Sequence, residues 1–96
     1  MSSGEDEDRY QLRTTPTVRR SLTERLPEAI AAAAYEFMIG PLLDNPYQVG
    51  KRLTAPLADK FSARRGTYRI LYGIDDGTRT VTVVDVDHRG DIYHRR

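Results

Sequence analysis

Cysteine is absent from this chain of 96 residues. Its absence excludes a disulfide framework and any zinc site built on thiolates. Long apolar runs are also absent: the longest, residues 29–35, is far too short to cross a bilayer, and no charged-then-apolar signal segment begins the sequence. We therefore expect a soluble cytoplasmic protein with no membrane association.

Charge is distributed unevenly along the chain. The formal net charge is +1, but four of the fourteen acidic residues stand together at Glu5–Asp8 in a segment of serine, glycine and acids. Without residues 1–9 the chain carries fourteen basic and ten acidic residues, a net charge of +4. We predict a disordered acidic tail over residues 1–9 and one small basic domain over residues 10–96, with room for a single core and a single site.

The first half of the domain reads as a strand followed by helices. Residues 10–14 alternate and are rich in strand formers, and Pro16 places this strand at an edge or an end. Thr17 is a candidate N-cap for a short helix that runs to Pro27. A second helix should begin at Pro27 and weaken at Gly40. Its expected apolar stripe is Ile30, Ala34, Phe37 and Met38.

Residues 47–60 read as a connecting loop, which Leu53 and Leu57 should fasten to the domain. Binding residues often lie on loops over a rigid scaffold, so the basic pair Lys51 and Arg52 is a candidate RNA contact, with ordinary solvation as the alternative. The aromatic ring of Tyr35, on the second helix, is expected to lie in the core or to line a groove.

A hairpin with two distinct faces is predicted for the last third of the chain. Tyr68, Ile70, Tyr72 and Ile74 share one face of a strand, while Arg69 lies on the other. Residues 75–78 are a turn signal, with Gly77 expected to supply a positive φ, and residues 79–87 should return antiparallel.

On that return strand, Asp85, Asp87 and Arg89 should share one face. The pairing brings Arg89 towards residues 60–65, with Arg69 close by. We therefore predict an α+β fold in which helices cover one face of a curved sheet and an arginine-rich groove lies on the other.

Two motifs in the same region resemble the RelE/ParE toxin superfamily. They are Ala63-Arg64-Arg65-Gly66-x-Tyr68-Arg69-Ile70-Leu71-Tyr72 and Val84-Asp85-Val86-Asp87-His88-Arg89-x-Asp91-Ile92-Tyr93. The similarity spans roughly residues 10–95 and is greatest to the RelE branch, the bacterial mRNA endoribonucleases of toxin–antitoxin pairs. It implies the RelE-like fold, an antiparallel-rich curved sheet with an N-terminal helical hairpin on one face.

The resemblance also implies roles for individual residues. Arg69 and Arg89 match the arginines that stabilise the scissile phosphate, Tyr93 matches a C-terminal tyrosine, and Lys60 matches a basic residue that assists proton transfer. Arg64 and Arg65, with Lys51 and Arg52, complete the candidate RNA-binding set. The general base stays open between Lys60, Tyr93 and His88, although the even position of His88 points its ring away from Arg89.

The family's reaction needs neither metal nor cofactor, because the neighbouring 2′-hydroxyl attacks the phosphorus and leaves a 2′,3′-cyclic phosphate. The resemblance further implies mRNA cleavage on the ribosome, and a RelB-like antitoxin that masks the toxin in a hetero-oligomer. Two alternatives stay open: a ParE-like inhibitor of DNA gyrase that cuts nothing, and an RNA-binding regulatory module.

Overall fold

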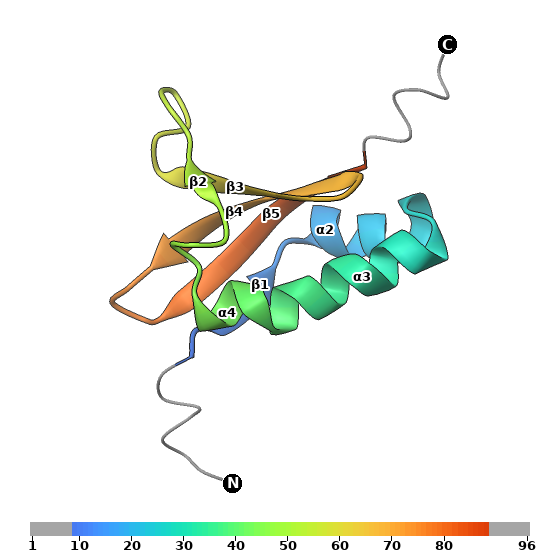
Figure 1. Ribbon diagram of the computed structural model, residues 1–96, viewed down its shortest axis with the longest axis horizontal. Coiled ribbons are helices and arrows are strands. Elements are labelled where there is room, and N and C mark those ends of the chain that lie inside the picture. Colours follow the sequence, from blue (N-terminus) through green and yellow to red (C-terminus); the bar gives the residue numbers. More distant parts are fainter. Residues whose placement is uncertain (1–8, 89–96) are drawn as a thin grey trace, which may run out of the picture.

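The computed structural model describes residues 9–88 of the chain (Figure 1). The acidic cluster Glu5–Asp8 and the predicted site residues Arg89 and Tyr93 lie outside the described residues. In chain order the elements are β1 (Gln11–Thr14), α2 (Pro16–Arg20), the π-helix η1 (Ser21–Arg25), α3 (Glu28–Ile39), α4 (Pro41–Asp44), β2 (Lys51–Arg52), β3 (Lys60–Arg65), β4 (Tyr68–Asp75) and β5 (Thr80–His88).

Five strands form one sheet in the order β1-β5-β4-β3-β2. The pairs β2/β3, β3/β4 and β4/β5 are antiparallel, and β1 joins the edge of β5 in parallel. The helices lie on one side of this sheet (Figure 1). The structure thus confirms the predicted α+β fold and the placement of β1 at an edge. Within residues 9–88 no helix is long and apolar enough to span a membrane.

The N-cap of the first helix lies two residues earlier than predicted. Thr15, not Thr17, is the N-cap: its Oγ1 accepts a hydrogen bond from the backbone N–H of Val18 at 3.3 Å. Pro16 then occupies the first helical turn, where its fixed φ fits the helix and its missing N–H costs nothing. The π-helical turn that continues α2 was not predicted, but it ends at Arg25, with Leu26 as its C-cap, before Pro27 as expected.

The long helix α3 buries the stripe that the sequence indicates. Ala34, Phe37 and Met38 are buried. The helix ends at Ile39, and Gly40 separates it from the short helix α4, as the Gly40-Pro41 pair predicts. The side chain of Tyr35 is 51% exposed, so of its two expected places, in the core or lining a groove, the core is wrong.

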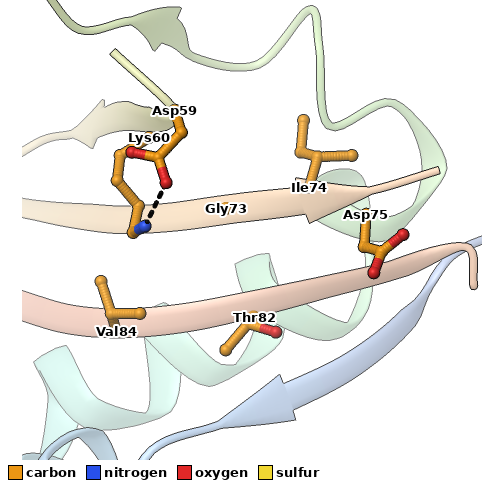
Figure 2. Close-up of a pocket in the computed structure, with 7 residues that line it drawn as sticks. All are labelled: Asp59, Lys60, Gly73, Ile74, Asp75, Thr82 and Val84. Atoms are coloured by element: carbon orange, nitrogen blue, oxygen red, sulfur yellow. Dashed lines mark hydrogen bonds and ion pairs between the residues drawn. The ribbon is translucent and has the colours of Figure 1, made fainter. Parts of the chain in front are cut away.

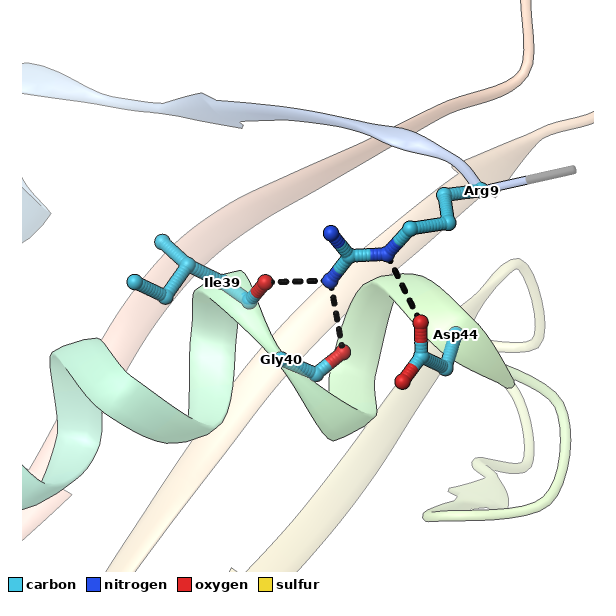
Figure 3. Close-up of polar contacts among 4 residues, drawn as sticks. All are labelled: Arg9, Ile39, Gly40 and Asp44. Carbon is cyan, nitrogen blue, oxygen red and sulfur yellow. Dashed lines mark hydrogen bonds and ion pairs between the residues drawn. The ribbon is translucent and has the colours of Figure 1, made fainter. Parts of the chain in front are cut away.

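Arg9 belongs to the folded domain, although the sequence analysis assigns it to the tail. Its Nε donates to the carboxylate of Asp44 at 2.7 Å, and its guanidinium donates to the carbonyl oxygens of Ile39 and Gly40 (Figure 3). The Gly40 carbonyl oxygen also accepts hydrogen bonds from the backbone N–H groups of Leu43 and Asp44, both at 3.1 Å. Arg9 therefore adds a further donor at the junction of α3 and α4, and its positive charge suits the C-terminal end of the α3 dipole.

The core lies between the helices and the inner face of the sheet, the face that the helices cover. β4 contributes Tyr68, Ile70 and Tyr72 to it, as predicted. The other buried apolar residues are Val18, Ala34, Phe37, Met38, Leu42, Leu43, Phe61, Ala63, Val81, Val83 and Val86.

Tyr72 is the largest fully buried side chain, and it ties the loop after α4 to the sheet. Its hydroxyl donates to the carbonyl oxygen of Pro46 at 2.6 Å, and burial raises the pKa of this phenol to about 12. The chain also passes close by at Gly50: a Cβ there would lie 2.4 Å from the Tyr72 hydroxyl and 2.8 Å from the carbonyl oxygen of Ser62.

The connection before β3 differs from the predicted loop. It contains the short strand β2. The side chain of Leu57 is 44% exposed, so Leu57 does not pack this segment into the core. Arg52 contacts the core instead, because its guanidinium lies 5.1 Å from the centre of the Phe61 ring.

The turn between β4 and β5 also departs from the prediction. The positive φ belongs to Arg79, at 52°, and not to Gly77. The Asp76 carboxylate in this turn accepts hydrogen bonds from the hydroxyls of Tyr10 and Tyr47. These bonds lower the pKa of Asp76 and raise the pKa of both tyrosines, and they hold the turn against β1 and the loop after α4.

Candidate functional site

The candidate site lies on the outer face of the sheet, the face that no helix of the described chain covers (Figure 1). Directly paired residues on antiparallel strands point to the same face, so the register assigns each side chain. Arg69 pairs with Arg64 on one side and with Asp87 on the other, and Ser62 pairs with Leu71 and Lys51. The outer face carries Lys51, Lys60, Ser62, Arg64, Arg69, Leu71, Gly73, Thr82, Val84, Asp85 and Asp87.

Four of the six described candidate residues gather on this face: Lys51, Lys60, Arg64 and Arg69. The other two are directed to the inner side. Arg52 pairs with the buried Phe61 and lies over its ring. Arg65 pairs with the buried Tyr68, and its guanidinium lies 4.6 Å from the centre of the Phe37 ring. The structure therefore does not join Arg52 and Arg65 to the other basic residues.

Arg64 and Arg69 stand directly opposite each other on neighbouring strands. Like charges in this position oppose strand pairing, so the arrangement has a cost that a bound anion would remove. The guanidinium of Arg69 already has one anionic partner, the carboxylate of Asp87 at 3.0 Å. Both side chains of that pair are 52% exposed, and exposed ion pairs add about 0–1 kcal/mol. A phosphate can therefore replace Asp87 at little cost.

A cavity of about 260 Å³ opens beside Arg69. Its apolar wall consists of Leu53, Leu57 and Leu71, and its polar wall of Ser62, Arg69, Asp85 and Asp87. Apolar surface next to a guanidinium suits a nucleotide, which presents a flat base and a charged phosphate a few ångströms apart.

Lys60 forms part of a second cavity, of about 290 Å³, on the same face (Figure 2). The aliphatic part of Lys60 lies across β4 at Gly73, where a Cβ would be only 3.7 Å from its Cδ. The ammonium group donates to Asp59 at 3.0 Å, and this hydrogen bond lowers the pKa of Asp59. Figure 2 shows the lysine extended across β4 towards Val84 of β5.

A β-bulge in β5, which the sequence analysis missed, sets the acidic edge of the site. Leu71 pairs with Asp85, but the next residue, Tyr72, pairs with Val83, so Val84 is an extra residue in β5. The buried valines Val81 and Val83 would otherwise place Asp85 and Asp87 on the inner face by simple alternation. The change of apolar spacing from Val81 and Val83 to Val86 is the sequence signal for this bulge.

His88 ends β5 opposite the buried Tyr68. It therefore points to the inner side, away from Arg69; its predicted orientation away from Arg89 stays a prediction, because Arg89 lies outside the described residues. Among residues 9–88 no group of three or more histidine, cysteine, aspartate or glutamate side chains is arranged to hold a metal ion.

Comparison with known proteins gives consistent matches. The family described as ParE toxin of type II toxin-antitoxin system, parDE, matches residues 5–93. Toxin RelG of Mycobacterium tuberculosis is 55% identical over 86 residues, which are 90% of this chain and 98% of the relative. Toxin RelE of the same organism is 47% identical over 88 residues, 92% of this chain and 90% of the relative.

A solved structure is also similar to this chain. It is the toxin–antitoxin complex RelBE2 from Mycobacterium tuberculosis, with 53% identity and a TM-score of 0.81 over 84% of this chain and 99% of the matched chain. This chain therefore shares its fold with that solved structure.

Proposed function

Since the chain belongs to the ParE toxin family of type II toxin–antitoxin systems and is a RelE-type toxin within it, we propose that it is an endoribonuclease that cleaves mRNA. The observation that carries the proposal is the direct pairing of Arg64 with Arg69 on the outer face. Two guanidinium groups on neighbouring strands suit the oxygens of a phosphodiester, and the ion pair of Arg69 with the Asp87 carboxylate at 3.0 Å supports a role for Arg69 in binding an anion.

The reaction is transesterification within the RNA. The 2′-oxygen of one nucleotide attacks the adjacent phosphorus, the bond to the 5′-oxygen breaks, and the products carry a 2′,3′-cyclic phosphate and a 5′-hydroxyl. Charge builds on the phosphoryl oxygens in the transition state. We propose that Arg69, supported by Arg64, stabilises that charge, a contribution worth about 10²–10³ in rate for a single well-placed donor.

Further residues complete the proposed site. Arg89 is a second transition-state arginine and Tyr93 orients the base or a proton, both in the segment outside the described residues. Lys60 protonates the 5′-oxygen or balances charge from the β3 side. Lys51 extends the phosphate-binding surface along β2. Positioning contributes about 7–11 kcal/mol where reactants are held in line, so we propose that the ribosomal decoding site presents the mRNA.

An antitoxin is the proposed partner. The similar solved structure is a toxin–antitoxin complex, and this chain shares its fold at 53% identity. We propose that a RelB-like chain binds this toxin as a hetero-oligomer and keeps RNA from the outer face.

Inhibition of DNA gyrase is the second candidate, because the matching family is described by its ParE toxins. The relatives at 47% and 55% identity carry the names RelE and RelG, which favour the nuclease. Gyrase inhibition requires no opposed arginines, so the outer face is the feature that separates the two functions.

Primer extension on a reporter mRNA tests the proposal, in a reconstituted translation system with and without the purified toxin. New 5′ ends at in-frame positions are expected, with 5′-hydroxyl products and a matching 2′,3′-cyclic phosphate. A parallel reaction without ribosomes shows whether they are required. Intact mRNA throughout, together with loss of supercoiling by gyrase, would replace the nuclease with the gyrase inhibitor. RNA binding without a cut product would leave only an RNA-binding module.

A further inference from the structure

We infer that Asp85 is the general base of this site, accepting the proton of the 2′-hydroxyl as that oxygen attacks the phosphorus. The inference rests on the proposed function and names a residue for its unassigned step. None of the three candidates that the sequence offers for this step, Lys60, Tyr93 and His88, is a carboxylate.

The position of Asp85 in the cavity supports this role. Its side chain lines the 260 Å³ cavity together with Arg69, Ser62 and the three leucines. The bulge at Val84 turns Asp85 to the outer face, and bulges are enriched next to active sites, where they redirect a side chain. Asp85 therefore lines the same cavity as Arg69, within reach of a nucleotide that binds there.

The neighbouring acid, Asp87, leaves Asp85 available. Asp87 is the residue opposite Arg69 and takes its guanidinium at 3.0 Å. Asp85 is opposite the apolar Leu71, and its carboxylate makes no hydrogen bond or ion pair among residues 9–88. The two carboxylates thus differ in their partners: Asp87 is paired with Arg69, and the carboxylate oxygens of Asp85 can still accept a proton in the cavity.

The strand order brings a carboxylate and an ammonium group to the outer face from the two neighbours of β4. Asp85 of β5 is paired with Leu71, and Lys60 of β3 is paired with Gly73, two residues further along β4. β4, which carries Arg69, lies between β5 and β3, about 5 Å from each. Asp85 reaches the outer face from β5, and Lys60 extends over β4 from β3 (Figure 2). Displacement at phosphorus requires the entering and leaving oxygens to stand roughly in line, so a base and an acid on opposite flanks fit the reaction.

The proton balance of the step is simple. The 2′-hydroxyl proton passes to a carboxylate oxygen of Asp85 as the bond from O2′ to phosphorus forms. The bond from phosphorus to O5′ breaks, and O5′ takes a proton from the Lys60 ammonium group. A solvent exchange then returns both residues to their starting forms, and no other reactant is needed.

Chemistry favours a carboxylate over the other candidates. Lysine and tyrosine ordinarily hold their protons at neutral pH, since their groups titrate near pH 10, so each must be deprotonated before it can act as a base. Carboxylates ordinarily titrate near pH 4 and need no such step. His88 is not placed for this step, because it faces the inner side of the sheet.

Single-turnover cleavage of mRNA on programmed ribosomes tests the inference with Asp85→Asn and Asp85→Ala. A well-placed base contributes about 10²–10⁴ in rate, so a loss of that size is expected for both variants, with RNA binding unchanged or tighter. Added formate should partly restore Asp85→Ala, because a small carboxylate fits the cavity. Glu36→Gln, on the exposed side of α3, is the matched control that removes one carboxylate from the other layer and keeps full activity.

A substrate with sulfur in place of O5′ separates the base from the acid. Its leaving group needs no proton, so it should rescue Lys60→Ala and leave Asp85→Asn slow. Cleavage by Asp85→Asn at the wild-type rate, or its rescue by the sulfur substrate, would overturn the inference while the nuclease stands. No cleavage by the wild-type toxin would overturn the nuclease and the inference together.

Discussion

The two faces of the sheet differ in the burial and the polarity of their side chains. On β4, Tyr68, Ile70 and Tyr72 point inward and are almost completely buried, while Arg69 and Leu71 between them point outward. The inner face meets helices through apolar contacts, and the outer face meets solvent through arginine, lysine and aspartate. The inner face therefore stabilises the fold, and the outer face is available for a ligand.

Arginines make this difference most visible. Arg52 and Arg65 lie over the aromatic rings of Phe61 and Phe37 and add to packing on the inner side. Arg64 and Arg69 oppose each other across two strands on the outer side. The same residue type thus has two roles, which are set by its position in the alternation of a strand.

Replacement of Arg69 by alanine should have the largest effect. We expect cleavage of ribosome-bound mRNA to fall by about 10²–10³, since one donor to the transition-state charge is lost. The melting temperature should change little, because the ion pair with Asp87 is exposed. Arg20→Ala, which removes an exposed arginine from α2, is the control and should cleave normally. A large loss of stability in Arg69→Ala would show that the outer face is structural.

Gly50→Ala should damage the inner side instead. The new Cβ would lie 2.4 Å from the Tyr72 hydroxyl and 2.8 Å from the Ser62 carbonyl oxygen, so the backbone must shift. Overpacking of this kind costs about 1–3 kcal/mol of unfolding free energy, measured by denaturant titration. Gly73→Ala, whose Cβ would make only ordinary contacts, is the comparison. Equal stability of the two variants would contradict the close approach at Gly50.

Tyr72→Phe should cost somewhat less. The substitution removes the hydrogen bond to the Pro46 carbonyl oxygen and leaves that oxygen without its partner, a loss of about 1–2 kcal/mol. The variant should keep its cleavage rate under conditions where it is folded. The wild-type phenol, with its pKa raised to about 12, should also ionise only at strongly alkaline pH, which ultraviolet absorbance can follow.

The Asp76 turn should give the smallest effect, and one that depends on pH. Its folded-state pKa is lowered by two tyrosine hydroxyls, so the contact adds stability above the ordinary carboxyl pKa and loses it as pH falls through the folded value. The melting temperature of Asp76→Asn should therefore be lower than that of the wild type at neutral pH, and the two should converge in acid. A constant difference at every pH would contradict the contact.

The fold follows closely from the sequence because its signals are local and periodic. The stripe of α3, the alternation of β4 and the glycine–proline break at Gly40 each depend on neighbouring residues. Caps and turns were less predictable. Both Thr15 and Thr17 offer a capping oxygen beside Pro16, and Arg79 takes a positive φ that glycine usually supplies.

Part of the candidate site could also be predicted, because the alternation of a strand is a local signal. Lys60 was named from the resemblance alone, and Arg69 from the resemblance and the alternation of its strand. Arg64 and Arg65 were both named as RNA-binding candidates, although adjacent residues on a strand point to opposite faces. Asp85 and Asp87 were not predicted as site residues. One bulge in β5 decides the face to which they point, and their distance from Arg69 depends on the pairing between β4 and β5.

A matched pair of double variants tests the central claim most directly. Arg64→Ala with Arg69→Ala removes two arginines from the outer face, and Arg52→Ala with Arg65→Ala removes two from the inner side, so both carry the same change of charge. We predict that the outer variant loses cleavage of ribosome-bound mRNA and keeps its melting temperature, while the inner variant cleaves and melts at a lower temperature. The reverse pattern, or equal loss of cleavage at equal stability, would contradict the assignment of function to the outer face.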